Sequence, residues 1–195
     1  MHIAITGGIG SGKSYVCRLL EKRGIKVYDC DKAAKRLMRS SAELQQKISK
    51  AVGREVFPEG VLDKALLSKF IVTSDDNAQK IDAVVHPAVA EDFLESEMEW
   101  LESAILFESH FHMRVHFNYI VCVTAPLEVR LQRVMLRDGI SRDKALEWMN
   151  RQLSQEEKMA QSDFCIENNG QDDLNLQIDR LLKEINTIKE KINNN

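Results

Sequence analysis

The chain has 195 residues, of which 44% are hydrophobic and 29% are charged, and its formal net charge is −3. This length predicts about one domain with a substantial core, and the charge argues against a nucleic acid as the main partner. No stretch approaches the roughly 18 consecutive apolar residues of a membrane span, and the first residues lack a signal-peptide pattern. With four cysteines and no C-x-x-C spacing, we expect a cytoplasmic globular protein without a membrane partner.

Five short apolar runs along the chain have the character of β-strands. Helix-like segments separate these runs, and such an alternation predicts a mostly parallel sheet with helices on both faces. The strand-like runs are residues 2–6, 25–28, 103–107, 119–124 and 164–166. We therefore predict an α/β fold.

The long stretch between the second and third runs, residues 41–101, predicts several helices. Pro58 and Gly60 supply a turn within it, and His86-Pro87 predicts the start of another helix, because proline fits the first helical turn. Apolar helices in this stretch could serve self-association or core packing. The sequence leaves these two open, so a homo-oligomer stays undecided.

Residues 126–160 predict a second group of helices. One of them ends at Gly139, where glycine predicts a left-handed cap, and another follows Ser141. The segment 154–157 has the form of a capping box or of an exposed kink. The last segment, residues 172–192, has apolar residues at helical spacing.

Residues 7–14 fit the phosphate-loop pattern G-x4-G-K-S, between a strand-like run and a helix-like segment. Glycines let the backbone N–H groups turn inward around a phosphate, and the helix N-terminus adds partial positive charge. Lys13 is predicted to contact the β- and γ-phosphates of ATP, and the Ser14 hydroxyl to bind Mg²⁺. The residues expected to bind the nucleotide are Gly8, Ile9, Gly10, Ser11, Gly12, Lys13, Ser14 and Tyr15.

The loop alone does not identify the phosphate acceptor. A GTPase would need an Asn-Lys-x-Asp element after a later strand, and the sequence has none. A motor or a large ring-forming ATPase would need a longer chain. The sequence therefore favours a small P-loop kinase.

Carboxylates follow two of the predicted strands, at the sheet edge where ligands bind in parallel α/β folds. Asp29 and Asp31 follow the second strand, where one carboxylate could accept a proton from an attacking hydroxyl and the other could hold Mg²⁺ through water. The alternative is that Asp31 caps the next helix. Glu108 closes the third strand, which resembles the position of a metal or acceptor carboxylate, or it only ends that strand.

Arginines follow the fourth strand, and Arg130, Arg133 and Arg137 share one helix face. With Arg142 beyond the Gly139 turn, they could swing over the γ-phosphate and spread the charge of the transition state. A solvated basic face is the alternative. Of these arginines, the sequence favours the role at the γ-phosphate for Arg137 more than for Arg130.

A short polar stretch follows the fifth strand. Asn168 and Gly170 tolerate left-handed backbone geometry, so a tight turn is one interpretation. Their place on the phosphate-loop side of the sheet equally suits contacts to a nucleotide base.

Taken together, these motifs resemble those of the dephospho-coenzyme A kinase family over nearly the whole chain. The first group comprises ITGGIGSGKS at 5–14, YDCD at 28–31, and His86-Pro87. The second comprises LFE at 106–108, RLQRVMLRDGIS at 130–141, Gln152, and SDFCIENNG at 162–170. The first motif occurs in many kinases, but the combination is specific.

The resemblance implies a P-loop core of five parallel strands, a helical coenzyme-A-binding insertion and a mobile lid. These parts correspond to about residues 1–40, 102–125 and 161–195 for the core, 41–101 for the insertion, and 126–160 for the lid. The implied reaction moves the γ-phosphoryl group of ATP to the ribose 3′-hydroxyl of dephospho-coenzyme A, the final step of coenzyme A synthesis.

The resemblance also implies roles for single residues. Asp31 matches the proposed catalytic base and contacts the acceptor, and Lys13 and Arg137 complete the catalytic set. The other matches are Ser14 for the metal, Arg142 for ATP, and His86 and Glu108 for the acceptor side.

Two positions depart from the family pattern. Tyr15 replaces the usual threonine, and the segment before Glu108 lacks the usual Pro-Leu-Leu, which weakens the role of that carboxylate. A shikimate or gluconate kinase is the nearest rival, although the Gly-Gly-x-Arg loop of shikimate kinases is absent. A nucleotide-binding regulator without turnover is a second rival, but it would tolerate the loss of Asp31 and the arginines, which are present.

Overall fold

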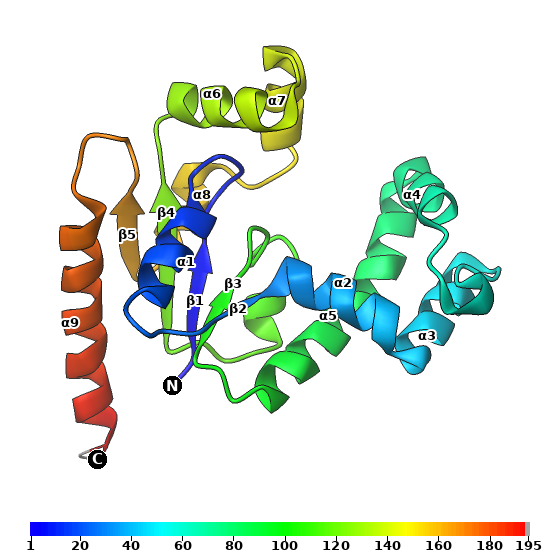
Figure 1. Cartoon of the computed structure of the whole chain (residues 1–195), viewed down its shortest axis with the longest axis horizontal. Helices are drawn as coiled ribbons and strands as arrows, with labels where there is room; N and C mark the ends of the chain where they lie inside the picture. The colour runs from blue at the N-terminus through cyan, green and yellow to red at the C-terminus, as the bar shows by residue number, and fades with distance from the viewer. Residues whose placement is uncertain (194–195) are drawn as a thin grey trace. The chain divides into compact units, whose positions relative to one another are not determined.

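The computed structural model describes residues 1–193. It contains a sheet of five strands in the order β2-β3-β1-β4-β5 (Figure 1). The strands are β1 (Ile3–Thr6), β2 (Val27–Asp29), β3 (Trp100–Glu102), β4 (Tyr119–Thr124) and β5 (Phe164–Glu167). The pairings of β1 with β3 and β4, and of β4 with β5, are parallel, as the alternation of strands and helices predicts.

The chain divides into two compact units, which we describe separately. The first unit comprises residues 1–28 and the chain from residue 98 onward, and the second comprises residues 29–97. The sequence analysis placed the start of the insertion near residue 41, whereas the second unit already begins at Asp29.

The first unit buries an apolar core between the sheet and its helices. Its helices are α1 (Lys13–Glu21), α6 (Leu127–Asp138), α7 (Arg142–Met149), α8 (Gln155–Ala160) and α9 (Leu174–Asn193), with a 3₁₀ turn at Phe111–Met113. Ile178, Leu181 and Ile185 form one face of α9 and join the core with Ile3 and Ile5 of β1. Figure 1 shows the loop after β1 and the α6–α7 pair beyond the same end of the sheet.

The predicted ends of the α6–α8 segments are confirmed. Gly139 ends α6 with φ 65°, and the Ser141 side chain caps α7. Ser154 accepts from the Glu157 N–H while the Glu157 side chain accepts from the Ser154 N–H, so the capping box, not the kink, is present.

The third strand lies earlier than predicted. It ends at Glu102, and residues 104–110 form turns instead of the strand expected at 103–107. The Phe111 N–H donates to the Leu106 carbonyl, and Leu106 is buried. The prediction was wrong because a short apolar run can be buried in a series of turns as well as in a strand, and its composition does not distinguish the two.

The second unit consists of helices, α2 (Cys30–Ser40), α3 (Ala42–Val52), α4 (Lys64–Thr73) and α5 (Asp75–Glu95), with a 3₁₀ turn at Pro58–Gly60. The side chains of Asp29, Ser41, Asp63 and Ser74 each cap the helix that follows. Each cap satisfies an N–H group that has no partner within its helix.

Helix α5 corrects the predicted start at His86-Pro87. It begins at Asp75, after the Ser74 cap, and continues through Pro87. Ile81, Val85 and Phe93 lie buried along it. Burial of this face on both sides of Pro87 outweighs the one helical hydrogen bond that proline removes.

Three of the cysteines are buried and Cys165 is exposed, and all four are free. Burial raises the pKa of the Cys122 thiol to about 12. In the described part of the chain, none of the helices combines the length and the apolar character needed to cross a bilayer.

Candidate active site

The phosphate loop, residues 7–14, connects the carboxyl end of β1 to α1. Gly12 precedes the helix with φ 93°, and a Cβ there would lie 2.1 Å from Asn168 Nδ2, so only glycine fits. Glycine provides no side-chain cap, which leaves the first N–H groups of α1 for an anion. Within residues 1–193, the buried hydroxyls of Thr6 and Ser11 have no hydrogen-bond partner. These donors fit the phosphates of a nucleotide.

Lys13 and Ser14 form the first turn of α1. Lys13 is 9% exposed, and its Nζ lies 3.5 Å from a carboxylate oxygen of Glu102 at the end of β3. Ser14 is exposed. A phosphate-loop Mg²⁺ takes one hydroxyl and one carboxylate, together with water and phosphate oxygens. Ser14 and Glu102 provide a donor set of this kind.

Arg130 of α6 packs directly against the phosphate loop. Its side chain is largely buried, and its Nε donates to the Ile9 carbonyl at 2.9 Å. A Cβ on Gly8 would lie 2.4 Å from Arg130 Nη2, so a side chain there would displace the guanidinium. Burial lowers the pKa of the guanidinium, but arginine remains protonated in proteins. A fixed positive charge therefore lies beside the loop.

Arg133, one turn further along α6, joins the loop to the stretch after β5. Its Nη1 donates to the carbonyls of Gly10 and Ser11 at 3.3 and 3.2 Å. Its Nη2 donates to the Asn168 carbonyl at 3.0 Å, and Asn168 Nδ2 donates to the Ser11 carbonyl at 2.9 Å. The structure therefore brings Asn168 to the phosphate loop, whereas Gly170 is exposed in the turn beyond it.

Arg137 and Arg142, the two arginines expected to contact ATP, pair with carboxylates. Arg137 Nη2 lies 2.7 Å from Asp138, and this hydrogen bond raises the arginine pKa. Arg142 donates from both Nη atoms to Glu128, at 2.7 and 2.6 Å, and this pair raises its pKa. Both side chains are exposed. Their contacts with ATP stay predictions.

Glu108 lies in the turns after β3, not at the end of that strand. Its Oε1 lies 2.7 Å from Lys158 Nζ and accepts from the Leu153 N–H at 3.0 Å. Lys158 is fully buried, and this burial lowers its pKa. The carboxylate is therefore engaged inside the first unit, and its predicted contact with the acceptor remains a prediction.

In the second unit, Asp29 rather than Asp31 caps α2. Asp29 Oδ1 accepts from the Lys32 N–H at 2.9 Å, and Oδ2 lies 3.0 Å from Lys32 Nζ. Asp31 is exposed in the first turn. The alternative role of Asp31 as a cap is therefore wrong, and its carboxylate lies at the surface of this unit.

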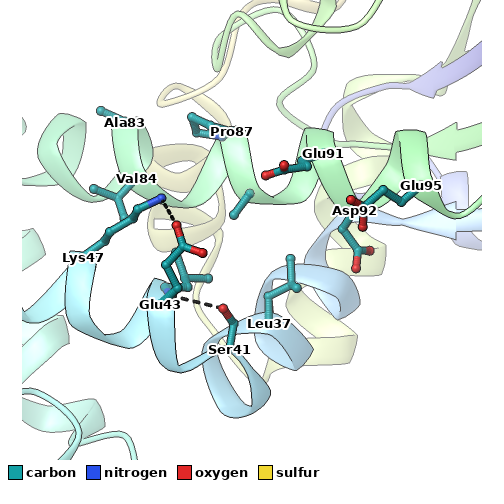
Figure 2. A pocket seen from close by; sticks show the side chains of 12 residues that line it. Leu37, Ser41, Glu43, Lys47, Ala83, Val84, Pro87, Glu91, Asp92 and Glu95 are labelled. Atoms are coloured by element: carbon teal, nitrogen blue, oxygen red, sulfur yellow. Dashed lines mark hydrogen bonds and ion pairs between the residues drawn. The ribbon is translucent and has the colours of Figure 1, made fainter.

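His86 lies inside α5 and forms a contact of 3.6 Å with Asp82, one turn earlier. Next to it, Pro87 lines a pocket of about 360 Å³ between α5 and the α2–α3 pair (Figure 2). Four carboxylates and one lysine, Lys47, line this pocket, and Lys47 pairs with Glu43 at 2.6 Å. This balance of charge does not suit the diphosphate of a nucleotide.

The sequence analysis missed two charged residues of the first unit. Glu102 escaped notice because the third strand was placed too late, although it is the last residue of a strand with apolar neighbours. Lys158 follows a capping box and has the appearance of a surface lysine. No local signal marks it as buried, because its partner Glu108 lies 50 positions earlier.

Comparisons with known proteins agree with these features. The family model described as dephospho-CoA kinase matches residues 1–193. A dephospho-CoA kinase of Bacteroides fragilis is 39% identical over 189 residues, which cover 93% of this chain and 91% of the relative. One of Thermus thermophilus is 34% identical over 194 residues, covering 94% and 91%.

Solved structures show the same fold. The crystal structure of TT1252 from Thermus thermophilus superposes with a TM-score of 0.78 at 35% identity, covering 94% of this chain and 97% of the other. A shikimate kinase from Acinetobacter baumannii has a TM-score of 0.55 at 16% identity, covering 96% and 94%, and shares the fold alone. With a phosphate loop closed by Lys13 and Ser14 and a family match along its described length, this chain belongs to the dephospho-CoA kinase family and is an ATP-dependent kinase.

Proposed function

We propose that the chain transfers the γ-phosphoryl group of ATP to the ribose 3′-hydroxyl of dephospho-coenzyme A, giving coenzyme A and ADP. The observation that carries this proposal is the uncapped, glycine-rich phosphate loop with Lys13 buried behind it, in a chain of this family. A cytoplasmic location and action without nucleic acid stay predictions from the sequence.

On the ATP side, the N–H groups of residues 10 and 12–14 and the Lys13 ammonium would bind the β- and γ-phosphates, because the N–H groups of Ile9 and Ser11 already donate to Gln152 and to Gly8. Ser14 and Glu102 would hold Mg²⁺, which neutralises phosphate charge when bound. Asp29, predicted as a ligand through water, is supported only by its place after β2. Arg137 and Arg142 would reach ATP after exchanging their carboxylate partners for phosphate oxygens, to which arginine binds equally well.

On the acceptor side, Asp31 would accept the proton of the 3′-hydroxyl as its oxygen attacks the γ-phosphorus. The bond from that phosphorus to the bridging oxygen breaks, and ADP carries the electron pair away. The exposure of Asp31 at the start of α2 supports this role, because a base must be accessible to its substrate. His86 stays a predicted acceptor contact.

The test is ADP release by the purified chain with Mg·ATP and one acceptor at a time. Dephospho-coenzyme A, shikimate, gluconate and a nucleoside monophosphate would be compared. We expect turnover with dephospho-coenzyme A alone. Turnover with another acceptor would show that the proposed substrate is wrong. Tight ATP binding without any turnover would indicate a regulator.

A further inference from the structure

Both backbone polar groups of Ile9, in the phosphate loop, are held by residues from distant parts of the first unit. The Ile9 N–H donates to Gln152 Oε1 at 2.9 Å. The Ile9 carbonyl accepts from Arg130 Nε, also at 2.9 Å. The Gly8–Ile9 and Ile9–Gly10 peptides are therefore each held by one side chain, which fixes the backbone on both sides of Ile9.

Gln152 is not part of a helix. It lies between α7 and α8, and its N–H donates to the Met149 carbonyl at 3.1 Å. On its other side, the Leu153 N–H donates to Glu108 Oε1 at 3.0 Å. The place of Gln152 beside Ile9 therefore depends in part on Glu108.

Glu108 is fixed by a buried cation. Its Oε1 lies 2.7 Å from Lys158 Nζ, and the same ammonium donates to the Ala104 carbonyl at 2.7 Å. The side chain of Lys158 is 0% exposed and that of Glu108 is 18% exposed. In the described chain, Glu108 Oε2 is buried without a hydrogen bond.

Such a pair is a poor source of stability. Desolvation of two charges offsets most of their attraction, and well-packed apolar residues often replace a buried pair without loss. A buried pair with one unsatisfied oxygen is therefore better explained by the geometry it imposes on its neighbours.

We propose that Glu108, fixed by Lys158, is a positioning residue that acts through Gln152 to hold the Ile9 N–H and so preorganises the phosphate loop for ATP. This role differs from the acceptor contact expected from the sequence, and it rests on the proposed binding of ATP at residues 8–14. A loop that is already ordered loses less conformational freedom when its ligand binds.

The test is a double-mutant cycle read out as the Kd for ATP on the full chain. Gln152→Ala removes the acceptor of the Ile9 N–H, and we expect the Kd to rise about tenfold, the effect of one well-placed hydrogen bond. A second variant replaces both members of the pair, by Glu108→Leu with Lys158→Met, so that no unpaired charge is left buried. We expect it to keep the urea midpoint and to raise the Kd by a similar factor.

The combined variant decides between the interpretations. If Glu108 acts through Gln152, the pair replacement adds no further loss in the Gln152→Ala background. The proposal would be overturned if the fold-increases in the Kd for ATP multiplied in the combined variant. It would also be overturned if the pair replacement alone left that Kd unchanged. Should the pair replacement not fold, the same cycle is run with Glu108→Gln, for which we expect a rise of about threefold that vanishes in the Gln152→Ala background.

Two controls complete the design. Gln161 is an exposed glutamine at the C-terminal end of α8, and its Nε2 donates to the Glu157 carbonyl. Gln161→Ala should leave the Kd for ATP unchanged. Lys13→Ala should abolish tight binding. An ATP Kd unaffected by Lys13→Ala would refute the proposed ATP site itself, whereas a Lys13 effect with multiplying losses in the cycle would refute the positioning role alone.

Discussion

In the first unit, the groups proposed to bind phosphate are mainly main-chain N–H donors of a loop held by side chains from α6, from the segment before α8 and from the end of β5. In the second unit, the groups proposed to contact the acceptor are side chains on helix surfaces, Asp31 exposed and His86 half-buried. Most substitutions other than proline leave a main-chain N–H in place, whereas any substitution changes a side-chain group. We therefore expect the two units to respond differently to single substitutions.

The largest effect expected is that of Lys13→Ala in the first unit. It removes the buried charge that we propose binds the β- and γ-phosphates, so both ATP binding and transition-state stabilisation should be lost. We expect kcat/KM to fall by about 10³-fold or more, with the folding midpoint retained, as steady-state kinetics and thermal unfolding would show. If kcat/KM stayed within tenfold of that of the parent chain, Lys13 would not be essential, and the proposed phosphate site of the first unit would be wrong.

The next effect belongs to the second unit. Asp31→Asn keeps the size of the side chain but removes the proposed base, and we expect kcat to fall by about 10²–10⁴-fold, the usual contribution of a general base. The KM for ATP should stay unchanged, because the phosphate loop is intact. If KM for ATP rises instead and kcat stays, Asp31 belongs to nucleotide binding and not to the acceptor side.

A smaller effect separates two arginines of α6. Arg133 donates to three carbonyls of the loop region, whereas Arg137 pairs with Asp138 at the surface. Arg133→Lys should therefore raise the KM for ATP about tenfold, because lysine cannot reproduce a planar fork. Arg137→Lys should lower kcat with little change in KM. If Arg133→Lys lowered kcat and Arg137→Lys raised the KM for ATP instead, Arg133 would have the catalytic role and Arg137 the structural one.

Sequence reasoning succeeded where a function depends on the backbone. The spacing from Gly7 to Ser14 identified the phosphate loop, because Gly7 and Gly10 have positive φ and a Cβ at either would lie within 2.6 Å of a backbone oxygen. It failed where an assignment depends on long-range pairing. The end of β3 at Glu102 is set by pairing with Ile5, and local apolar character carries no information about that partner.

The same limit explains two further residues. The buried state of Lys158 depends on Glu108, which lies far away in the sequence, and a lysine within a polar helix gives no sign of burial. The sequence offered Asp31 as the cap of α2, but Asp31 lies inside that helix and Asp29 directly precedes it. The extended backbone of Asp29, φ −92° and ψ 106°, is what makes it the cap.

The smallest effect concerns Asp29, which is both the cap of α2 and the predicted outer ligand of Mg²⁺. Serine caps a helix about as well as aspartate, so Asp29→Ser should change the free energy of unfolding by less than about 0.5 kcal/mol. It removes the carboxylate, however, and the Mg²⁺ concentration at half-maximal rate should rise about threefold, because a ligand reached through water contributes modestly. Asp29→Ala serves as the matched variant, since it removes both functions and should also lower the stability by about 1 kcal/mol. If Asp29→Ser titrates with Mg²⁺ like the parent chain while Asp29→Ala loses only stability, Asp29 is a cap and nothing more. The metal would then depend on Ser14 and Glu102, which both lie in the first unit, and the second unit would contribute to the acceptor alone.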